Sequence, residues 1–181
     1  LTYGDERGIT ATVEGNGTNA KWTWTSSAAD VVSVTGNGAT ATLGSLKAGN
    51  ATITVTYEDD DRYGTATIQV TIEPKTLTVG AGTAHVTKPY SGTTGATALQ
   101  GTLDIQGLVG DDQPVYWSVG AYPDKNVGSG TMEVTLKLDG PAKDNYALDS
   151  NTVDVPYTIT PAQLSLGTIQ AVDRDYIAGD K

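Results

Sequence analysis

The sequence predicts an all-β protein built from two β-sandwich modules in tandem. Threonine, valine and glycine are abundant, and short alternating segments recur between Gly, Asn and Asp residues, as is typical of strands joined by tight turns. Leucine, alanine, lysine and glutamate never recur at helical spacing, so helices are not expected. Domains most often contain about 100 to 150 residues. A chain of 181 residues therefore has room for two small modules.

Six alternating segments are predicted to be the strands of the first module. Gly15-Asn16-Gly17 and Gly36-Asn37-Gly38 accept the positive φ angles that hairpin turns require. Val32 and Val34 are expected to face the same side of their strand. Six short strands at this spacing indicate a small antiparallel sandwich. The predicted strands span residues 9–13, 21–25, 31–35, 39–43, 51–57 and 65–72.

Two proline-containing breaks divide the chain. Pro74 and Pro161 each interrupt a strand pattern, because proline donates no backbone hydrogen bond and restricts the residue before it. The breaks predict a first module at residues 1–73, a second at 74–161, and a remaining segment at 162–181.

The residues that follow the two breaks resemble each other. Lys75-Thr-Leu-Thr-Val-Gly80 aligns with Ala162-Gln-Leu-Ser-Leu-Gly167, and Tyr90 aligns with Tyr176. An internal repeat of this kind is typical of modular arrays. Residues 162–181 are therefore predicted to start a further repeat or to add an edge strand, and the parent protein is expected to continue with more modules.

Composition excludes several classes of partner and chemistry. The net charge of -10, from 21 acidic and 11 basic residues, opposes nucleic acid and anionic membrane surfaces, since phosphate partners require basic patches. The absence of cysteine rules out disulfides, thiolate zinc sites and a cysteine nucleophile. No segment approaches the roughly 20 apolar residues of a membrane span. A monomer without nucleic-acid or membrane contacts is expected.

The first module resembles the group 2 bacterial immunoglobulin-like domain. Three runs carry this resemblance: Trp24-Thr-Ser-Ser27, Val32-Ser-Val34 and Gly49-Asn-Ala-Thr-Ile-Thr-Val55. They follow the family's order of a tryptophan with serines, a short valine strand, a glycine turn and a closing alternating strand. The resemblance covers residues 1–73 and implies an immunoglobulin-like β-sandwich.

The second module resembles the YDG repeat domain of bacterial adhesins. Lys88-Pro-Tyr-Ser-Gly-Thr-Thr94 stands where that family has Lys-x-Tyr-Asp-Gly-Thr-Thr, with Ser91 in place of the aspartate. Four further matches follow in the family's order: Gly110-Asp-Asp112, Tyr122-Pro-Asp-Lys-Asn-Val-Gly128, Asn145-Tyr-Ala-Leu148 and Ile159-Thr-Pro161. The resemblance implies a secreted or cell-surface (cell wall) bacterial location and carries no catalytic residue.

No catalytic constellation is predicted, and the chain is not expected to be an enzyme. His85 is the only histidine, and it lies in an alternating segment without a nearby nucleophile or orienting carboxylate. We expect it to be an exposed strand residue. No cofactor is predicted.

Two acidic clusters are weak candidates for calcium. Asp59, Asp60 and Asp61 gather in one predicted loop, and Asp111 and Asp112 in another. Calcium takes six to eight oxygen ligands, and neither cluster has the spacing of a known calcium loop. Solvated turns are the favoured interpretation, with calcium as the alternative.

Tryptophans are the candidates for ligand binding. Trp22 and Trp24 lie two residues apart and so share one face of their strand, where they either stack on a sugar ring or fill the core. The core is the favoured interpretation for both, and also for Trp117. A Lys–Asn crosslink from Lys88 or Lys125 to Asn126 or Asn145 remains open, because the sequence gives no pairing.

These features predict a non-catalytic structural or stalk module that spaces or presents other domains. Its expected partners are neighbouring repeats of the longer protein. Two alternatives remain open. One is an adhesin module that binds a glycan or an extracellular-matrix protein on a host surface, which an exposed aromatic patch would favour. The other is an accessory domain of a secreted carbohydrate-active enzyme.

Overall fold

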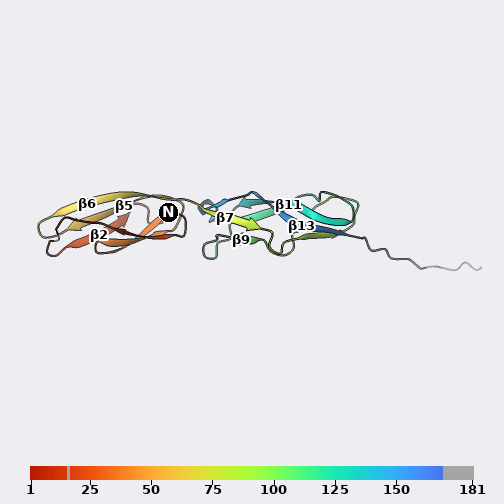
Figure 1. The fold of residues 1–181 in the computed structure, drawn as a ribbon, viewed down its shortest axis with the longest axis horizontal. Helices are drawn as coiled ribbons and strands as arrows, with labels where there is room; N and C mark the ends of the chain where they lie inside the picture. Colours follow the sequence, from red (N-terminus) through yellow and green to blue (C-terminus); the bar gives the residue numbers. More distant parts are fainter. Residues whose placement is uncertain (16, 169–181) are drawn as a thin grey trace, which may run out of the picture.

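The computed structural model describes residues 1–15 and 17–168, and its regular structure is almost entirely β strand. The predicted all-β class is therefore confirmed. Figure 1 shows two β-rich bodies placed end to end, with the amino terminus close to the place where they meet. Within the described part of the chain, the single helical element is the short 3-10 helix η1 (Lys143–Asn145), and no helix is long and apolar enough to cross a membrane.

The first module consists of two three-stranded antiparallel sheets that face each other. Their strand orders are β1-β4-β3 and β2-β5-β6. The strands are β1 (Glu6–Thr10), β2 (Lys21–Ser26), β3 (Val32–Asn37), β4 (Thr40–Ser45), β5 (Gly49–Glu58) and β6 (Tyr63–Ile72).

Each predicted strand of this module overlaps an observed one, and the first differs most. The pattern predicted a strand at residues 9–13, whereas β1 spans Glu6–Thr10. The strand ends there because the amide of Ala11, which donates to Ala39 O at 2.8 Å, makes the last hydrogen bond to the neighbouring hairpin. Gly15 and Gly38 have the expected positive φ angles of 67° and 59°. Asn16 lies outside the described residues.

The core of the first module lies between its two sheets. Val32 and Leu43 come from one sheet, and Ile53 and Ile72 come from the other, and all four are buried. Val34 packs against the same cluster, as its alternation with Val32 predicts.

The second module pairs a four-stranded sheet with a three-stranded sheet. Their orders are β10-β11-β13-β8 and β12-β7-β9, and two of the pairs, β13 with β8 and β12 with β7, are parallel. The strands are β7 (Lys75–Gly80), β8 (Val86–Pro89), β9 (Asp104–Gln106), β10 (Val115–Val119), β11 (Gly128–Leu138), β12 (Tyr146–Leu148) and β13 (Thr152–Thr160).

The second module has its own core, which includes Leu77, Val86, Val134 and Val155. Tyr3 is the residue that packs against the buried clusters of both modules. Two residues, Glu73 and Pro74, separate β6 from β7, and β13 ends directly before Pro161, so both prolines lie outside the strands.

The prediction that Trp117 lies in the core is wrong. Its side chain is 48% exposed in β10, which is an edge strand of the four-stranded sheet. Val115 and Val119 on the same face pack in and against the core, so the inner face of β10 is covered on either side of Trp117 but not at Trp117 itself.

The segment after Pro161 is exposed. Residues 162–168 belong to no strand, and Leu164 and Leu166 are 91% and 93% exposed. Residues 169–181, including Tyr176, lie outside the described residues. The start of a further repeat at 162–181 therefore stays a prediction.

Candidate functional site

A groove runs along one side of the first module, between the edge strands β1 and β6. Each of these strands is an outer member of its three-stranded sheet. Three cavities of about 400, 170 and 490 Å³ follow one another there and share lining residues. We call this groove the seam. Its apolar lining includes Ile9, Ala11, Trp24, Ile53, Ala66 and Ile68.

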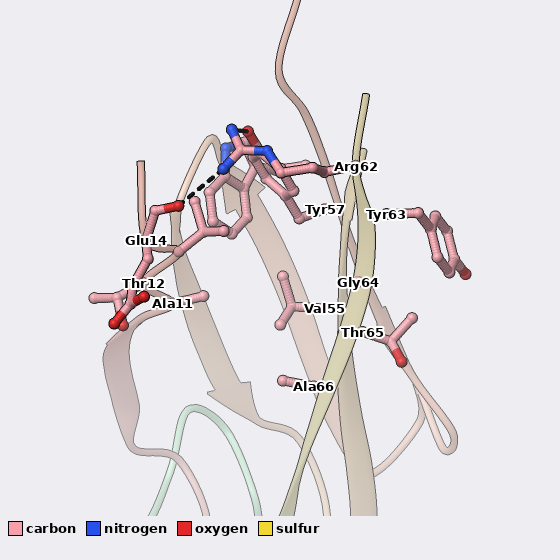
Figure 2. Close-up of a pocket in the computed structure, with 12 residues that line it drawn as sticks. Ala11, Thr12, Glu14, Val55, Tyr57, Arg62, Tyr63, Gly64, Thr65 and Ala66 are labelled. Carbon is pink, nitrogen blue, oxygen red and sulfur yellow. Dashed lines mark hydrogen bonds between the residues drawn. The ribbon is translucent and has the colours of Figure 1, made fainter. Parts of the chain in front are cut away.

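The seam ends in a tip cavity near the turn between β5 and β6, drawn in Figure 2. Tyr57, Val55 and Ala66 form its apolar side, whereas Tyr63 points away from it. Arg62 lies across one end of the cavity, where its guanidinium donates to Glu14 O at 2.8 Å. The apolar side is therefore enclosed by strand residues and covered at one end by a cation.

Asp59 holds Arg62 in place. One carboxylate oxygen accepts from Arg62 Nη2 at 2.7 Å and from the Tyr57 hydroxyl at 2.5 Å, and the other accepts from the amide of Arg62. The hydrogen bond from Tyr57, supported by the amide of Asp61 and by Arg62, lowers the pKa of Asp59 to about 2. This carboxylate thus stays ionised and organises the turn.

Trp22 and Trp24 lie on the inner face of β2 but remain half-buried. Trp22 lines the tip cavity and meets the Tyr57 ring edge-on, with centroids 4.8 Å apart. Trp24 lines the middle cavity and donates from Nε1 to Gly38 O at 2.9 Å. A Cβ atom at Gly36 would lie 2.4 Å from the Trp24 ring, so that glycine permits the close approach. Trp24 packs against the buried cluster of the first module, whereas Trp22 contacts Tyr57 and lies outside that cluster. The seam leaves part of each ring open.

Two of the remaining acidic candidates, Asp60 and Asp112, accept hydrogen bonds from other protein groups. Asp60 accepts from the Thr18 hydroxyl at 2.8 Å and from the Asn19 amide. Asp112 accepts hydrogen bonds from two tyrosines. Within residues 1–15 and 17–168, no group of three or more His, Cys, Asp or Glu side chains converges for a metal ion. Asp61 and Asp111 therefore join no such group.

A second site lies at the junction of the two modules. The hydroxyls of Tyr3 and Tyr146 donate to the same oxygen of Asp112, at 2.9 and 2.8 Å. Their rings meet edge-on with centroids 5.3 Å apart. Tyr146 is buried, and its hydroxyl also accepts from the amide of Val109 at 2.9 Å.

The environment of the junction favours neutral tyrosines. Burial, followed by the hydrogen bond to Asp112, raises the pKa of Tyr146 to about 12 and also raises the pKa of Tyr3. Both hydroxyls therefore keep their protons at neutral pH and remain donors to Asp112.

Further contacts cross the junction from other elements. The amide of Ala48 donates to Asn145 Oδ1 at 3.0 Å. Gly4 has a φ of 84°, and a Cβ atom there would lie 2.7 Å from Val109. Thr2 forms a parallel bridge with Glu73, which ties the start of the chain to the connection between the modules. The sequence did not predict this site, because its partners are far apart along the chain.

Lys88, the first residue of the YDG-like motif, is buried. Its ammonium donates to Thr93 O and Gly95 O and lies 4.5 Å from the centre of the Tyr122 ring. Its amine thus fastens the loop that follows β8. Of the amides considered for a crosslink, Asn145 bonds to the first module and Asn126 bonds to Asp124.

His85 is exposed, as predicted. It pairs with Gln100 in an isolated antiparallel bridge, and its Nδ1 lies 3.0 Å from Thr83 O. Its neighbours Ala84 and Val86 are buried on the opposite face.

Comparison with known proteins supports part of the sequence interpretation. Residues 73–153 match the family described as the YDG domain, which confirms the resemblance of the second module. No curated protein matches the chain. Among solved structures, the chain is similar to the crystal structure of human protocadherin-24 EC1-2, form II, with a TM-score of 0.31 and 11% identity. That match covers 78% of this chain and 82% of the protocadherin chain.

Proposed function

We propose that the chain is a non-catalytic spacer of a secreted or cell-surface bacterial protein, with a group 2 bacterial immunoglobulin-like domain preceding the YDG domain. The observation that carries this proposal is the junction, where Tyr3 of the first module packs and hydrogen-bonds against Tyr146 and Asp112 of the second. A spacer must hold neighbouring modules in a defined direction. The match of residues 73–153 to the YDG domain supports the resemblance from which the surface location was predicted.

The connection between the modules is short as well as packed. Only Glu73 and Pro74 separate β6 from β7, and proline fixes its own φ angle. The amide of Tyr3 donates to Glu73 O and the amide of Glu73 donates to Leu1 O, at 3.0 and 2.8 Å. These bonds hold Glu73 against the first module. Bending at Pro74 would break the hydrogen bond from Tyr3 to Asp112, which crosses the junction. The junction therefore favours one direction of the two modules.

The spacer proposal predicts that removing Tyr3 loosens the junction. The chain has no cysteine, so Thr65→Cys and Ser129→Cys, both at exposed positions, give a single pair of spin labels across the modules. Without further substitution, we expect double electron–electron resonance to show a narrow distribution of the distance between the two labels. Tyr3→Ala should broaden it markedly, because the packing and the bond to Asp112 are both lost.

Tyr63→Ala is the matched control, since that tyrosine is 72% exposed and lies far from the junction. It should leave the distribution unchanged. A broad distance distribution in the labelled chain without either substitution would contradict the spacer proposal.

A second candidate function is adhesion, and the tip cavity favours it. Trp22 and Tyr57 give the cavity an aromatic lining of the kind that contacts sugar rings or apolar side chains. In a screen against glycans and extracellular-matrix proteins, an adhesin would bind one ligand class. Trp22→Ala should abolish that binding, while Trp117→Ala in the other module should not. Silence of the folded chain would remove adhesion.

A further inference from the structure

The first and last strands of the second module carry its two connections to the rest of the chain. Glu73 and Pro74 join β6 to β7, and β13 ends directly before Pro161. Figure 1 shows that β7 begins where the two bodies meet, whereas the chain leaves the second body at its far end. Tension along the molecule therefore enters the module at the first residue of β7 and leaves it at the last residue of β13.

Tension in this direction acts along the strands and not across them, because the strands of the second body lie along the long axis of the molecule (Figure 1). The hydrogen bonds of a sheet run across from strand to strand. Pulling a strand along its own axis loads all of its bonds at once, whereas pulling two neighbouring strands apart at one end breaks their bonds one after another. The second module is therefore arranged to resist tension along the molecule better than tension that separates a strand pair.

The two end strands are not held equally. β13 lies inside the four-stranded sheet, where it pairs with eight residues of β11 and four of β8. β7 is the central strand of the other sheet, but it pairs with only three residues of β12 and three of β9. Because the same tension passes through both strands, the strand with fewer ladder bonds should slide first. That strand is β7.

Side chains of β7 add to its resistance. Leu77 is completely buried, and Val79 packs against the same cluster. The carbonyl of Leu77 also accepts a hydrogen bond from the amide of Asp149 at 3.1 Å. To move along its axis, β7 must withdraw both apolar side chains from the core while its ladder bonds break. Apolar burial and hydrogen bonding therefore oppose the movement together.

We propose that the second module has a mechanical function: it resists tension along its long axis, and β7 is the strand that limits the force it withstands. This inference goes beyond the spacer proposal, which concerns the direction of the two modules. It depends only on the strands of the second module, so it stands or falls separately from the junction.

Pulling the same module in two directions with optical tweezers tests the proposal. The chain has no cysteine, so pairs of exposed residues can be replaced to attach the handles. Thr65→Cys with Gln163→Cys applies tension along the axis, because the extended remainder of β6 transmits the force to β7. Ser91→Cys with Gln163→Cys separates β8 from β13 at one end, where the amide of Tyr90 donates to Thr160 O. The first direction should require several times the unfolding force of the second.

Three matched valines identify the limiting strand. Val79, Val119 and Val153 are half-buried and pack against the same core cluster, but they lie in β7, β10 and β13. Replacing each by alanine removes the same atoms and should lower the midpoint of denaturant unfolding to a similar extent. Only Val79→Ala should clearly lower the force along the axis, because forced unfolding depends on the barrier to unfolding and not on equilibrium stability. β10 carries neither connection, and β13 is held by more bonds.

Three results would overturn the proposal. Equal forces in the two directions would show that the module has no special resistance along its axis. A loss of force in Val119→Ala as large as that in Val79→Ala would show that the force only follows overall stability. A larger loss in Val153→Ala than in Val79→Ala would show that β7 is not the limiting strand. None of these results depends on the distance distribution that tests the spacer proposal.

Discussion

Replacing Lys88 by alanine is expected to lower the free energy of unfolding of the second module by about 3 kcal/mol. The substitution removes a buried stem, which leaves a cavity, and deprives Thr93 O and Gly95 O of their donor. It also removes the cation from the Tyr122 ring. The loop after β8 would lose its attachment to the core.

Two controls separate these contributions to stability. Lys88→Met keeps the stem and removes only the charge and the donors, so a smaller loss of about 1 kcal/mol is expected. Lys137→Ala removes a lysine that also lies near an aromatic ring, 5.8 Å from Tyr116, but is largely exposed, and should change stability little.

The measurement is denaturant unfolding followed by tryptophan fluorescence. Trp117 reports the second module, whereas Trp22 and Trp24 report the first, so substituting those two by phenylalanine isolates the relevant transition. If Lys88→Ala unfolds at the same denaturant concentration as the parent, the buried ammonium has no structural role.

The sequence predicted the features that depend on neighbouring residues. Alternation placed Val32 and Val34 on the inner face, glycines marked the hairpin turns, and proline located the break at Pro74. Each of these signals acts over a few residues, because backbone preferences and side-chain alternation are local. Five strands of the first module were accordingly predicted to within two residues at each end, whereas the first was displaced by three residues.

Features that depend on distant partners could not be predicted. The bond between Tyr3 and Asp112 joins residues 109 positions apart, and neither residue type alone indicates a junction. The parallel pairing of β13 with β8 likewise has no turn signal, because the two strands are separated by most of the module. Strand order also decides exposure: Trp117 has the pattern of a core residue but lies on an edge strand.

The candidate site was predicted in part for the same reason. Trp22 and Trp24 were correctly identified as residues of one face, and they do line the seam. The seam itself arises because β1 and β6 are both outer strands on the same side of the sandwich. Their residues alternate like those of covered strands, so the sequence carries no sign that the side between them is open.

Replacing Tyr146 by phenylalanine is expected to destabilise the junction at neutral pH and to reduce the loss of stability in alkali. The hydroxyl of Tyr146 both accepts from Val109 and donates to Asp112, so its removal leaves two half-buried polar groups short of a partner. A cost of about 1 to 3 kcal/mol in the free energy of unfolding follows.

The alkaline effect follows from the raised pKa of Tyr146. An unfolded tyrosine loses its proton near pH 10, whereas burial and Asp112 raise the pKa of Tyr146 to about 12 in the folded chain. Its contribution to stability is therefore complete below about pH 10 and is lost as the pH rises towards 12, because only the unfolded state releases the proton.

Tyr146→Phe should show a shallower decline over this window, and some decline should remain because the pKa of Tyr3 is also raised. Tyr63→Phe, at an exposed position, should retain the full slope of the parent. Equal slopes for Tyr146→Phe and the parent, measured by denaturant unfolding at stepped pH, would show that the junction tyrosine does not control the response of the chain to alkali.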